Sequence, residues 1–354
     1  MTEPSLQHTV LIVDDMPDNI DILVNVLSPY YRVLAAAGGD KALQIAAGPA
    51  RPDLILLDIM MPGLNGYQVC ERLKADPETR GIPVIFVTAM GEVEDERLGL
   101  ELGAVDYLVK PVSPALVLAR VRTHLALYDQ HRELARLVEQ RTAELNKTRH
   151  LLIRRLARAA EYRDTETGNH IVRISHYARL LGRTLGMSPE SVDTLFHAAP
   201  LHDVGKIGVP DSIMLKHGPL DPAEQEILNQ HTTFGADIIG EQQDELLRAA
   251  RLIALSHHEH WDGSGYPHGL KGVAIPLMAR IVALADAFDD LTSDRPFHKS
   301  IPVAEAVRRI DQQAGSHFDP GLMEAFHKAL PQLKQIREEF ADGYGLVVID
   351  SDLT

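Results

Sequence analysis

The second half of the chain concentrates residue types that bind transition metals. Histidine occurs 17 times in 354 residues, and 13 of these histidines lie between His170 and His327. Imidazole and carboxylate ligands without thiolate suit Fe, Mn, Ni, Co or Zn rather than Ca²⁺ or Mg²⁺ alone. The candidate ligands are Glu166, His170, His202, Asp203, His231, His257, His258 and Asp286. We therefore predict a transition-metal centre in this half of the chain.

The spacing of these candidates favours more than one ion. Neighbouring residues on a helix point about 100° apart. The adjacent pairs His202–Asp203 and His257–His258 should therefore seldom chelate one ion and should more easily contact two. The whole set also exceeds what one octahedral ion can bind. We predict at least two ions, with a carboxylate such as Asp203 bridging them.

The first half carries a different set, in which acidic residues predominate. Asp14 and Asp15 follow one apolar run, and Asp58, Thr88 and Lys110 follow three others. Three carboxylates at one edge of a sheet would repel each other unless a hard cation lay among them, and oxygen-only ligation suits Mg²⁺. A hydroxyl and an ammonium group beside them could hold an incoming phosphoryl group, which leaves Asp58 as the nucleophile.

The elements that must position these acids alternate between strands and helices. Helical patterns such as Asn19–Leu27 and Tyr67–Leu73 separate the apolar runs. The predicted strands are Val10–Val13, Arg32–Ala36, Leu54–Leu57, Val84–Val87 and Tyr107–Val109. Such β-α repetition indicates a doubly wound parallel sheet, in which functional groups gather at the carboxyl ends of the strands.

A long helix is predicted between the two halves, from residue 113 to about 160. This segment has no glycine, and its only proline is Pro114. Val138, Leu145 and Leu152 recur every seven residues, a spacing typical of a coiled coil. Polar residues at other seam positions leave two interpretations open, a dimerising helix or a solvated spacer. From residue 151 onward helical patterns continue, which indicates an all-α domain.

Composition excludes several classes of protein. The net charge of −15, from 35 basic and 50 acidic residues, disfavours binding to DNA or to an anionic membrane. The single cysteine, Cys70, excludes an internal disulfide and fits a reducing compartment. No apolar run approaches the ~20 residues of a membrane span, and the N-terminus lacks the pattern of a signal peptide. We therefore expect a cytoplasmic protein without membrane insertion.

Four segments of the first half resemble the receiver domain of response regulators. They are VLIVDD (10–15), LILLDIMMPGLNG (54–66), VIFVTA (84–89) and GAVDYLVKP (103–111). The resemblance extends over residues 7–125. It implies a flavodoxin-like fold, a bound Mg²⁺ and phosphorylation by a sensor histidine kinase.

The receiver resemblance also implies roles for single residues. Asp58 would be the phosphoacceptor, and Asp15 would bind Mg²⁺ directly with Asp14 beside it. Tyr107 would change rotamer with phosphorylation, or it is simply a half-exposed strand residue. The residues that contact the phosphoryl group would be Thr88 and Lys110.

The second half resembles the HD-GYP family, a branch of the HD metal-dependent phosphohydrolases. The motifs are LHDVGKIGVPD (201–211) and HHEHWDGSGYPHGLKG (257–272), extended by residues 163–173 and 285–297. The resemblance implies hydrolysis of cyclic di-GMP to pGpG, GMP or both, at a centre of two or three metals. Glu166 occupies the place of the acid associated with a third metal.

Further residues of this half would act on the substrate. Lys206, three residues after the catalytic Asp203, could neutralise charge that develops on phosphoryl oxygens. Tyr266 and Arg295 would contact the substrate. Lys299 is a weaker candidate because His298 separates it from the Arg-Pro-aromatic sequence that a basic residue often follows directly in the family.

We therefore interpret the chain as a response regulator, with an α/β doubly wound receiver domain (7–125), a helical linker (126–160) and an all-α HD-GYP domain (161–354). We expect a homodimer, with GGDEF-domain proteins as further candidate partners. Two alternatives stay open. One is a hydrolase that prefers pGpG or another cyclic dinucleotide, and the other is a catalytically weak interaction module.

Overall fold

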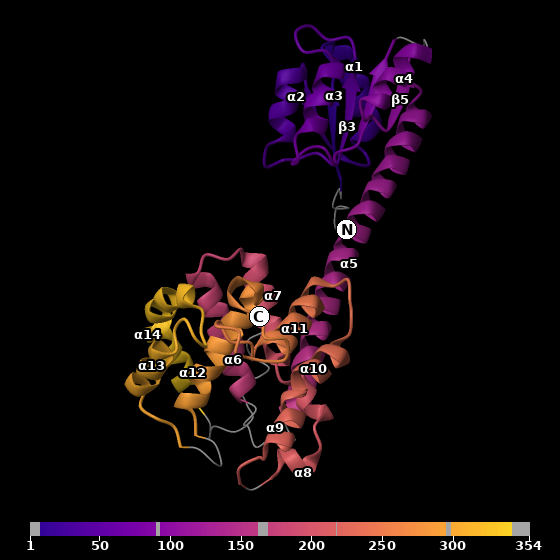
Figure 1. Ribbon diagram of the computed structural model, residues 1–354. Helices are drawn as coiled ribbons and strands as arrows, with labels where there is room; N and C mark the ends of the chain where they lie inside the picture. Colours follow the sequence, from indigo (N-terminus) through magenta and orange to yellow (C-terminus); the bar gives the residue numbers. More distant parts are fainter. Residues whose placement is uncertain (1–7, 90–92, 162–168, 217, 295–298, 342–354) are drawn as a thin grey trace, which may run out of the picture. The chain divides into compact units, whose positions relative to one another are not determined.

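The computed structural model describes residues 8–89, 93–161, 169–216, 218–294 and 299–341. It divides into two compact units, Met1–Ala143 and Glu144–Thr354 (Figure 1). Among the described residues, no helix combines the length and apolar character needed to cross a membrane.

The first unit is built on a parallel sheet. Its described part contains five strands in the order β2-β1-β3-β4-β5, all parallel. They are β1 (Thr9–Val13), β2 (Arg32–Ala36), β3 (Leu54–Asp58), β4 (Val84–Thr88) and β5 (Asp106–Val109). The predicted doubly wound sheet is confirmed. Because the strand order reverses between β1 and β3, a functional site is expected at their carboxyl ends.

Helices pack on both faces of this sheet, which explains why its central strands are apolar except at their ends. Residues of α1 and of the first turns of α5 join one core, while residues of α2 and α3 join the other. The helices of this unit are α1 (Pro17–Leu27), α2 (Gly39–Ala46), α3 (Gly66–Ala75) and α4 (Val93–Glu101). The sheet is therefore fixed from both sides, and its polar edge has a rigid support.

The connecting segment forms one helix, α5 (Pro114–Glu161), as predicted. Proline is well tolerated at the first helical position because its missing N–H has no helical partner there. Near its start, Val117 and Val121 are buried in the first unit, and near its end Ile153 and Ala157 are buried in the second. The helix thus belongs to the core of each unit at one of its ends.

The second unit is helical, as predicted. Its longer helices are α6 (Asn169–Thr184), α7 (Pro189–Ala198), α9 (Pro222–Asn229), α10 (His231–Ile239), α11 (Glu245–Ser256), α12 (Leu277–Thr292), α13 (Val303–Gln312) and α14 (Met323–Glu339). Short turns of helix lie between them: η1 (Ala199–Leu201), η2 (Val204–Gly208), α8 (Asp211–Met214), η3 (Gly272–Ala274) and η4 (Pro320–Leu322).

An aromatic cluster fixes α6, α12 and α14 against each other. The ring of Phe288 meets the ring of Tyr177 edge-on at 5.5 Å and that of Phe326 at 5.7 Å. All three side chains are fully buried. Such edge-to-face pairs add about 0.5–1.5 kcal/mol each beyond their buried area. This packing sets the relative position of α6 and α12, which both carry candidate metal ligands.

Candidate metal centre and phosphoacceptor site

The candidate ligands of the second unit come from the ends of several elements and from one helix interior. His170 lies in the first turn of α6, and His231 is the first residue of α10. His202 and Asp203 lie between η1 and η2, and His257 caps the C-terminus of α11. Residues at helix ends can point along or across the helix axis, which allows distant segments to converge on one point.

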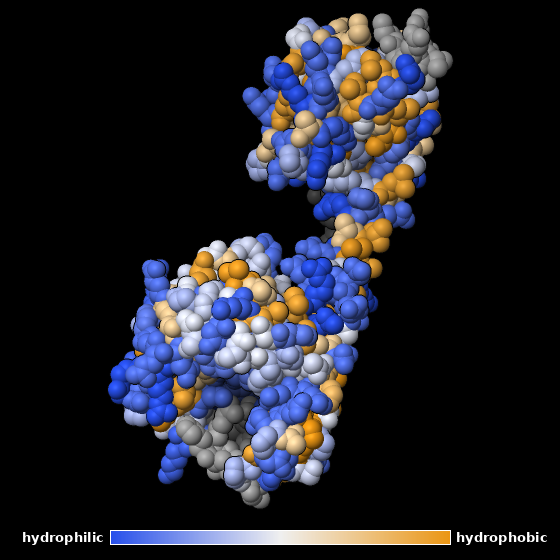
Figure 2. Space-filling model, in the orientation of Figure 1, coloured by the Kyte–Doolittle hydropathy of each residue, from blue (hydrophilic) through white to orange (hydrophobic). Residues whose placement is uncertain are grey.

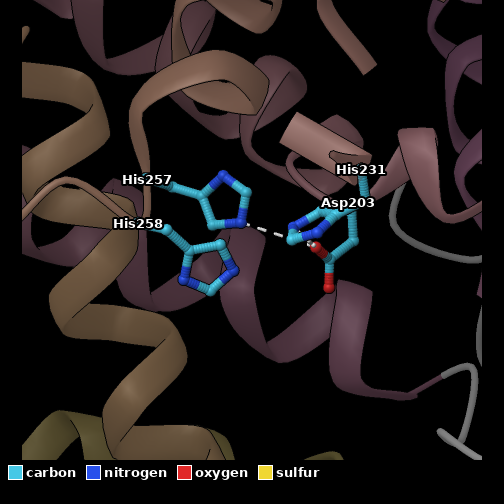
Figure 3. Close-up of side chains that lie close together, drawn as sticks. All are labelled: Asp203, His231, His257 and His258. Carbon is cyan, nitrogen blue, oxygen red and sulfur yellow. Dashed lines mark ion pairs between the residues drawn. The ribbon is translucent and has the colours of Figure 1, made fainter. Parts of the chain in front are cut away.

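Seven of the eight predicted ligands converge into two neighbouring clusters. In each cluster, one potential ligand atom per residue lies within 4.8 Å of the others. The first cluster contains His170, His202 and Asp286. The second contains Asp203, His231, His257 and His258, whose side chains point toward one another in Figure 3.

Asp203 lies between the two clusters. Its Oδ2 atom is 3.3 Å from Nε2 of His202, which belongs to the first cluster. Its Oδ1 atom is 3.3 Å from Nε2 of His231 and 3.4 Å from Nε2 of His257, which belong to the second. A carboxylate with one oxygen toward each cluster has the arrangement needed to bridge two ions.

His202 and His231 present their Nε2 atoms to the site as lone-pair acceptors. Nδ1 of His202 donates to the carbonyl of Ala199 at 3.0 Å, and Nδ1 of His231 donates to the carbonyl of Leu228 at 2.7 Å. Because a carbonyl can only accept, the proton of a neutral ring lies on Nδ1. These two Nε2 atoms are buried, and neither hydrogen-bonds to another protein atom. Buried polar atoms without partners are rare, and here the donor set fits divalent metal ions.

Two glycines allow the approach of the segments that carry these ligands. A Cβ atom at Gly205 would lie 1.8 Å from the carbonyl oxygen of His231, so only glycine lets η2 pack on α10 this closely. A Cβ atom at Gly265 would lie 2.4 Å from the carbonyl oxygen of His258. The next residue, Tyr266, consequently stacks on the His258 ring, with centroids 4.9 Å apart.

Burial and neighbouring charges shift the pKa values of residues in the centre. Burial raises the pKa of Asp203, but Lys206, His202 and His231 together outweigh this effect and hold the pKa well below its ordinary value. Burial lowers the pKa of His258 well below its ordinary value, and His257 beside it acts in the same direction. At neutral pH this carboxylate is therefore ionised and His258 is uncharged, the forms that bind metal.

One expectation about the spacing is wrong. The adjacent residues His257 and His258 were expected to contact different ions, but their ligand atoms belong to the same cluster. The reason is that α11 ends at Ser256, so His257 is only its cap and His258 lies beyond the helix. The angular separation of neighbouring helical residues does not apply there.

The first unit brings its acids together as well. Asp14, Asp15 and Asp58 offer oxygen atoms within 4.8 Å of one another. The ammonium group of Lys110 lies 2.7 Å from Oδ2 of Asp14 and 2.9 Å from Oδ2 of Asp58. Burial raises the pKa of Asp58, although the bond to Lys110 opposes this. Thr88 ends the neighbouring strand β4.

Comparisons with known proteins agree with both halves of this description. The model of the response regulator receiver domain matches residues 10–122, and that of the HD domain matches residues 133–322. A probable cyclic di-GMP phosphodiesterase of Vibrio cholerae is 44% identical, over 95% of this chain and 81% of its own length. The cyclic di-GMP phosphodiesterase response regulator RpfG of Xanthomonas campestris is 39% identical, over 94% of this chain and 90% of its own. The chain belongs to the cyclic di-GMP phosphodiesterase response regulators.

The family assignment gives the two sites their general chemistry. A receiver domain accepts a phosphoryl group from a donor such as a histidine kinase. An HD domain is that of a divalent metal-dependent hydrolase, for which the two clusters of this response regulator supply candidate ligands. A 3'3'-cGAMP-specific phosphodiesterase of Vibrio cholerae is also similar, at 38% identity over 56% of this chain and 38% of its own length.

Among the described residues of the response regulator, Lys206, Lys299 and Tyr107 are not part of the clusters. Glu166 and Arg295 lie outside the described residues. Lys299 is exposed on the segment between α12 and α13, and Lys206 lies beside Asp203, with 2.8 Å between its Nζ atom and Oδ2 of the carboxylate. Tyr107 is half-buried on β5.

Two residues that support the site were missed in the sequence. Asp289 accepts hydrogen bonds from His170 and from Arg173. Glu259 is buried and accepts from the backbone N–H groups of His268 and Leu270, which holds the loop around Tyr266. The spacing of Asp289 three residues after Asp286 was a usable signal, because it predicts the same face of one helix.

Proposed function

We propose that this response regulator hydrolyses the phosphodiester bonds of cyclic di-GMP, giving pGpG, GMP or both, at the paired clusters around Asp203. The observation that carries the proposal is the position of Asp203, which presents one carboxylate oxygen to each cluster. The names of the relatives that span most of the chain supply the substrate.

The side chains have distinct tasks in this proposal. The two clusters would hold at least two transition-metal ions, which when bound lower the pKa of a water molecule and polarise the phosphodiester. Lys206 would place its positive charge where the phosphoryl oxygens gain negative charge. Tyr266, fixed by its stack on His258, would border the substrate. Glu166, Arg295 and Lys299 keep the roles predicted for them, a third metal site and phosphate contacts.

The direct test combines metal analysis with nucleotide chromatography. Full-length protein purified without oxygen should contain more than one transition-metal ion per chain and should consume cyclic di-GMP. Chelation should stop turnover, and one of the five predicted metals should restore it. If metal-loaded protein left cyclic di-GMP intact, the proposal would be wrong.

Similarity to a 3'3'-cGAMP-specific phosphodiesterase makes the choice of dinucleotide a separate question. We would decide which dinucleotide is preferred by measuring kcat/KM for cyclic di-GMP, 3'3'-cGAMP and pGpG on one preparation. We expect the highest value for cyclic di-GMP, since relatives named for it match nearly the whole chain. Binding to a GGDEF-domain protein that persists without turnover would support the interaction-module alternative instead.

We also propose that phosphorylation of Asp58, with Mg²⁺ held by the acids beside it, controls hydrolysis through α5. Within the first unit, Asp106 adjoins Tyr107 and accepts hydrogen bonds from Arg120 and His124 of α5, at 2.7 and 2.9 Å. Rotation of Tyr107 would therefore shift the neighbouring Asp106 and, through its two hydrogen bonds, the start of α5. Thr88 and Lys110 would hold the phosphoryl group and trigger the rotation.

The other end of α5 contacts elements that support the metal centre. Within the second unit, Arg149 pairs with Asp244 at 2.7 Å, and Asp244 caps the start of α11. His257, a candidate ligand, caps the end of the same helix. A displacement of α5 would thus reach this ligand through one rigid helix, which provides the physical connection that a coupling claim needs.

Beryllofluoride, which mimics the phosphoryl group, tests this coupling. We expect it to raise the rate of hydrolysis in the wild type and to have no effect in Asp58→Ala, which lacks the acceptor. The measurement is the hydrolysis rate with and without beryllofluoride, alongside its binding to the receiver domain. Equal rates in all four conditions, with binding shown for the wild type, would remove regulation from the proposal.

Dimerisation through α5 is a further part of the proposal. Leu134, Val138, Leu145 and Leu152 are 57–70% exposed, and Figure 2 shows hydrophobic side chains on the surface of this helix. A coiled coil between two chains would bury them. Sedimentation measures the oligomeric state, and we expect a dimer for the wild type and a weakened dimer for Leu145→Lys. A wild-type monomer would leave α5 as a spacer helix.

The predicted domain boundaries, the cytoplasmic location and the partnership with a cognate sensor kinase stay part of the proposal. The kinase is tested most simply, by transfer of labelled phosphate to the wild type but not to Asp58→Ala.

A further inference from the structure

Asp289 is a buried carboxylate behind the first metal cluster. It lies on α12, one turn after Asp286, and is 1% exposed. Its Oδ2 atom accepts a hydrogen bond from Nδ1 of His170 at 2.8 Å. The opposite nitrogen of the same ring, Nε2, lies 3.5 Å from Oδ1 of Asp286. The imidazole is therefore placed between a supporting carboxylate and a ligand carboxylate, both carried by α12.

Arg173 holds Asp289 in place from the other side. Its Nε atom donates to Oδ1 at 2.6 Å, and its Nη2 atom donates to Oδ2 at 2.8 Å. Its Nη1 atom donates to the carbonyl of Phe340 at 2.9 Å. The arginine side chain is only 2% exposed. A two-pronged arginine–carboxylate contact fixes orientation as well as charge, so Asp289 has little freedom to turn away from His170.

A buried ion pair of this kind needs an explanation beyond stability. Removing two charges from water costs free energy that their attraction often fails to return, and apolar replacements are often as stable. The pair does, however, fix the ring of His170. A metal-binding histidine usually donates its second N–H to such a partner, which determines both tautomer and orientation.

The second cluster is supported differently. His231 and His257 donate through Nδ1 to backbone carbonyls of the helices around them, Leu228 and Ile253. No side-chain substitution removes a carbonyl. His170 of the first cluster is therefore oriented by a mutable side chain, whereas His202, His231 and His257 are oriented by backbone carbonyls. This difference can be measured.

We propose that Asp289 is a positioning residue for the ion of the first cluster, orienting His170 so that Nε2 carries the lone pair toward His202 and Asp286. The inference rests on the proposed metal centre and adds that its two ions depend on different supports. Loss of the Asp289 carboxylate should weaken metal binding at the first cluster and leave metal binding at the second cluster unchanged.

The variant Asp289→Asn tests this with little change of volume. Arg173 donates to both oxygens of Asp289, so an amide must turn its NH₂ group toward one hydrogen-bond donor. When that group faces Nδ1 of His170, the ring proton moves to Nε2 and the lone pair for the metal is lost. Loss of such a supporting partner typically weakens metal binding by about 10–100-fold.

The measurement is a competition titration of full-length, metal-free protein with Mn²⁺ or Co²⁺, which counts ions and gives one affinity per site. His170→Ala and His231→Ala identify the affinities that belong to the first and second clusters. The affinity of the first cluster is the one that His170→Ala abolishes. In Asp289→Asn this affinity should fall by about 10–100-fold. The affinity of the second cluster, identified by its loss in His231→Ala, should stay at the wild-type value, since backbone groups orient His231 and His257.

Two further variants separate positioning from general damage. Asp319→Asn weakens another buried ion pair, with Arg280, and should leave both affinities unchanged. Arg173→Lys keeps a positive charge beside Asp289 and leaves its carboxylate able to accept from His170, but it removes the two-pronged contact. It should lower the unfolding midpoint and should weaken metal binding at the first cluster less than Asp289→Asn does. The inference is wrong if Arg173→Lys lowers the metal affinity of the first cluster as strongly as Asp289→Asn does. It is also wrong if Asp289→Asn lowers the affinities of both clusters equally or changes neither. A wild type that binds no ion would instead contradict the proposed metal centre itself.

Discussion

Replacing Asp203 by alanine is expected to reduce hydrolysis of cyclic di-GMP to the background level. Asp203 is the residue that faces both clusters, with its oxygens 3.3 Å from His202 and 3.3 Å from His231. Its removal takes one ligand from each proposed ion and also the negative charge between them. His202→Ala, which removes a ligand from the first cluster, should likewise abolish turnover. The measurement is nucleotide chromatography together with metal content per chain.

A matched control is available in Asp311→Ala. Asp311 also pairs with a histidine, His327, at 2.9 Å, but both side chains are exposed. This variant should keep wild-type activity and metal content, whereas Asp203→Ala should lose both while its receiver domain still binds beryllofluoride. Undiminished turnover in Asp203→Ala, or an active wild type with less than one metal ion per chain, would contradict the proposed centre.

Replacing Lys206 by alanine is expected to lower kcat by about 100-fold or more, the usual effect of losing a charge that stabilises a transition state. The Lys206 side chain is 15% exposed and lies 2.8 Å from Oδ2 of Asp203. Metal content should not fall, because the variant removes a neighbouring cation rather than a ligand. The rate and the metal content, measured on the same preparation, therefore distinguish this variant from Asp203→Ala.

Lys216→Ala provides the control for the loss of a lysine charge. Lys216 pairs with Glu224 on the surface, and its side chain is 35% exposed. We expect wild-type kcat from this variant. Parental turnover in Lys206→Ala would show that the lysine only neutralises Asp203 in the resting enzyme, and its assignment to the transition state would be withdrawn.

The fold of the first unit could be predicted because its signals are local. Each strand is a short apolar run, and each polar residue of the site follows such a run directly in the sequence. Parallel strands in a doubly wound sheet all end at one edge. Because Asp14, Asp58 and Lys110 each follow a predicted strand directly, the sequence places them together at that edge. The structure agrees, with Lys110 within 2.9 Å of both acids. The long helix was equally predictable, because glycine is absent from it and proline occurs only at its start.

The candidate metal centre of the second unit could be predicted only as a list of candidate ligands. Residue types and the HD-GYP motifs selected the candidates, but helix periodicity does not say which distant helices meet. The division into two clusters follows from tertiary packing, in which Gly205 lets η2 approach α10 and the aromatic contacts around Phe288 fix α6 against α12. The same packing placed His257 and His258 in one cluster, against the expectation from their adjacency.

The support of the ligands was decided by tertiary structure alone. Asp289 and Arg173 are 116 residues apart in the sequence, and Asp289 and His170 are 119 apart. The spacing from Asp286 places Asp289 on the same helix face, but it does not distinguish a buried carboxylate that orients a histidine from a solvated acid. The distinction depends on burial and on the partner that the fold brings close, and both arise only when α6 and α12 pack together. The sequence by itself determined the chemistry of this protein, and the packing of its helices decided the geometry.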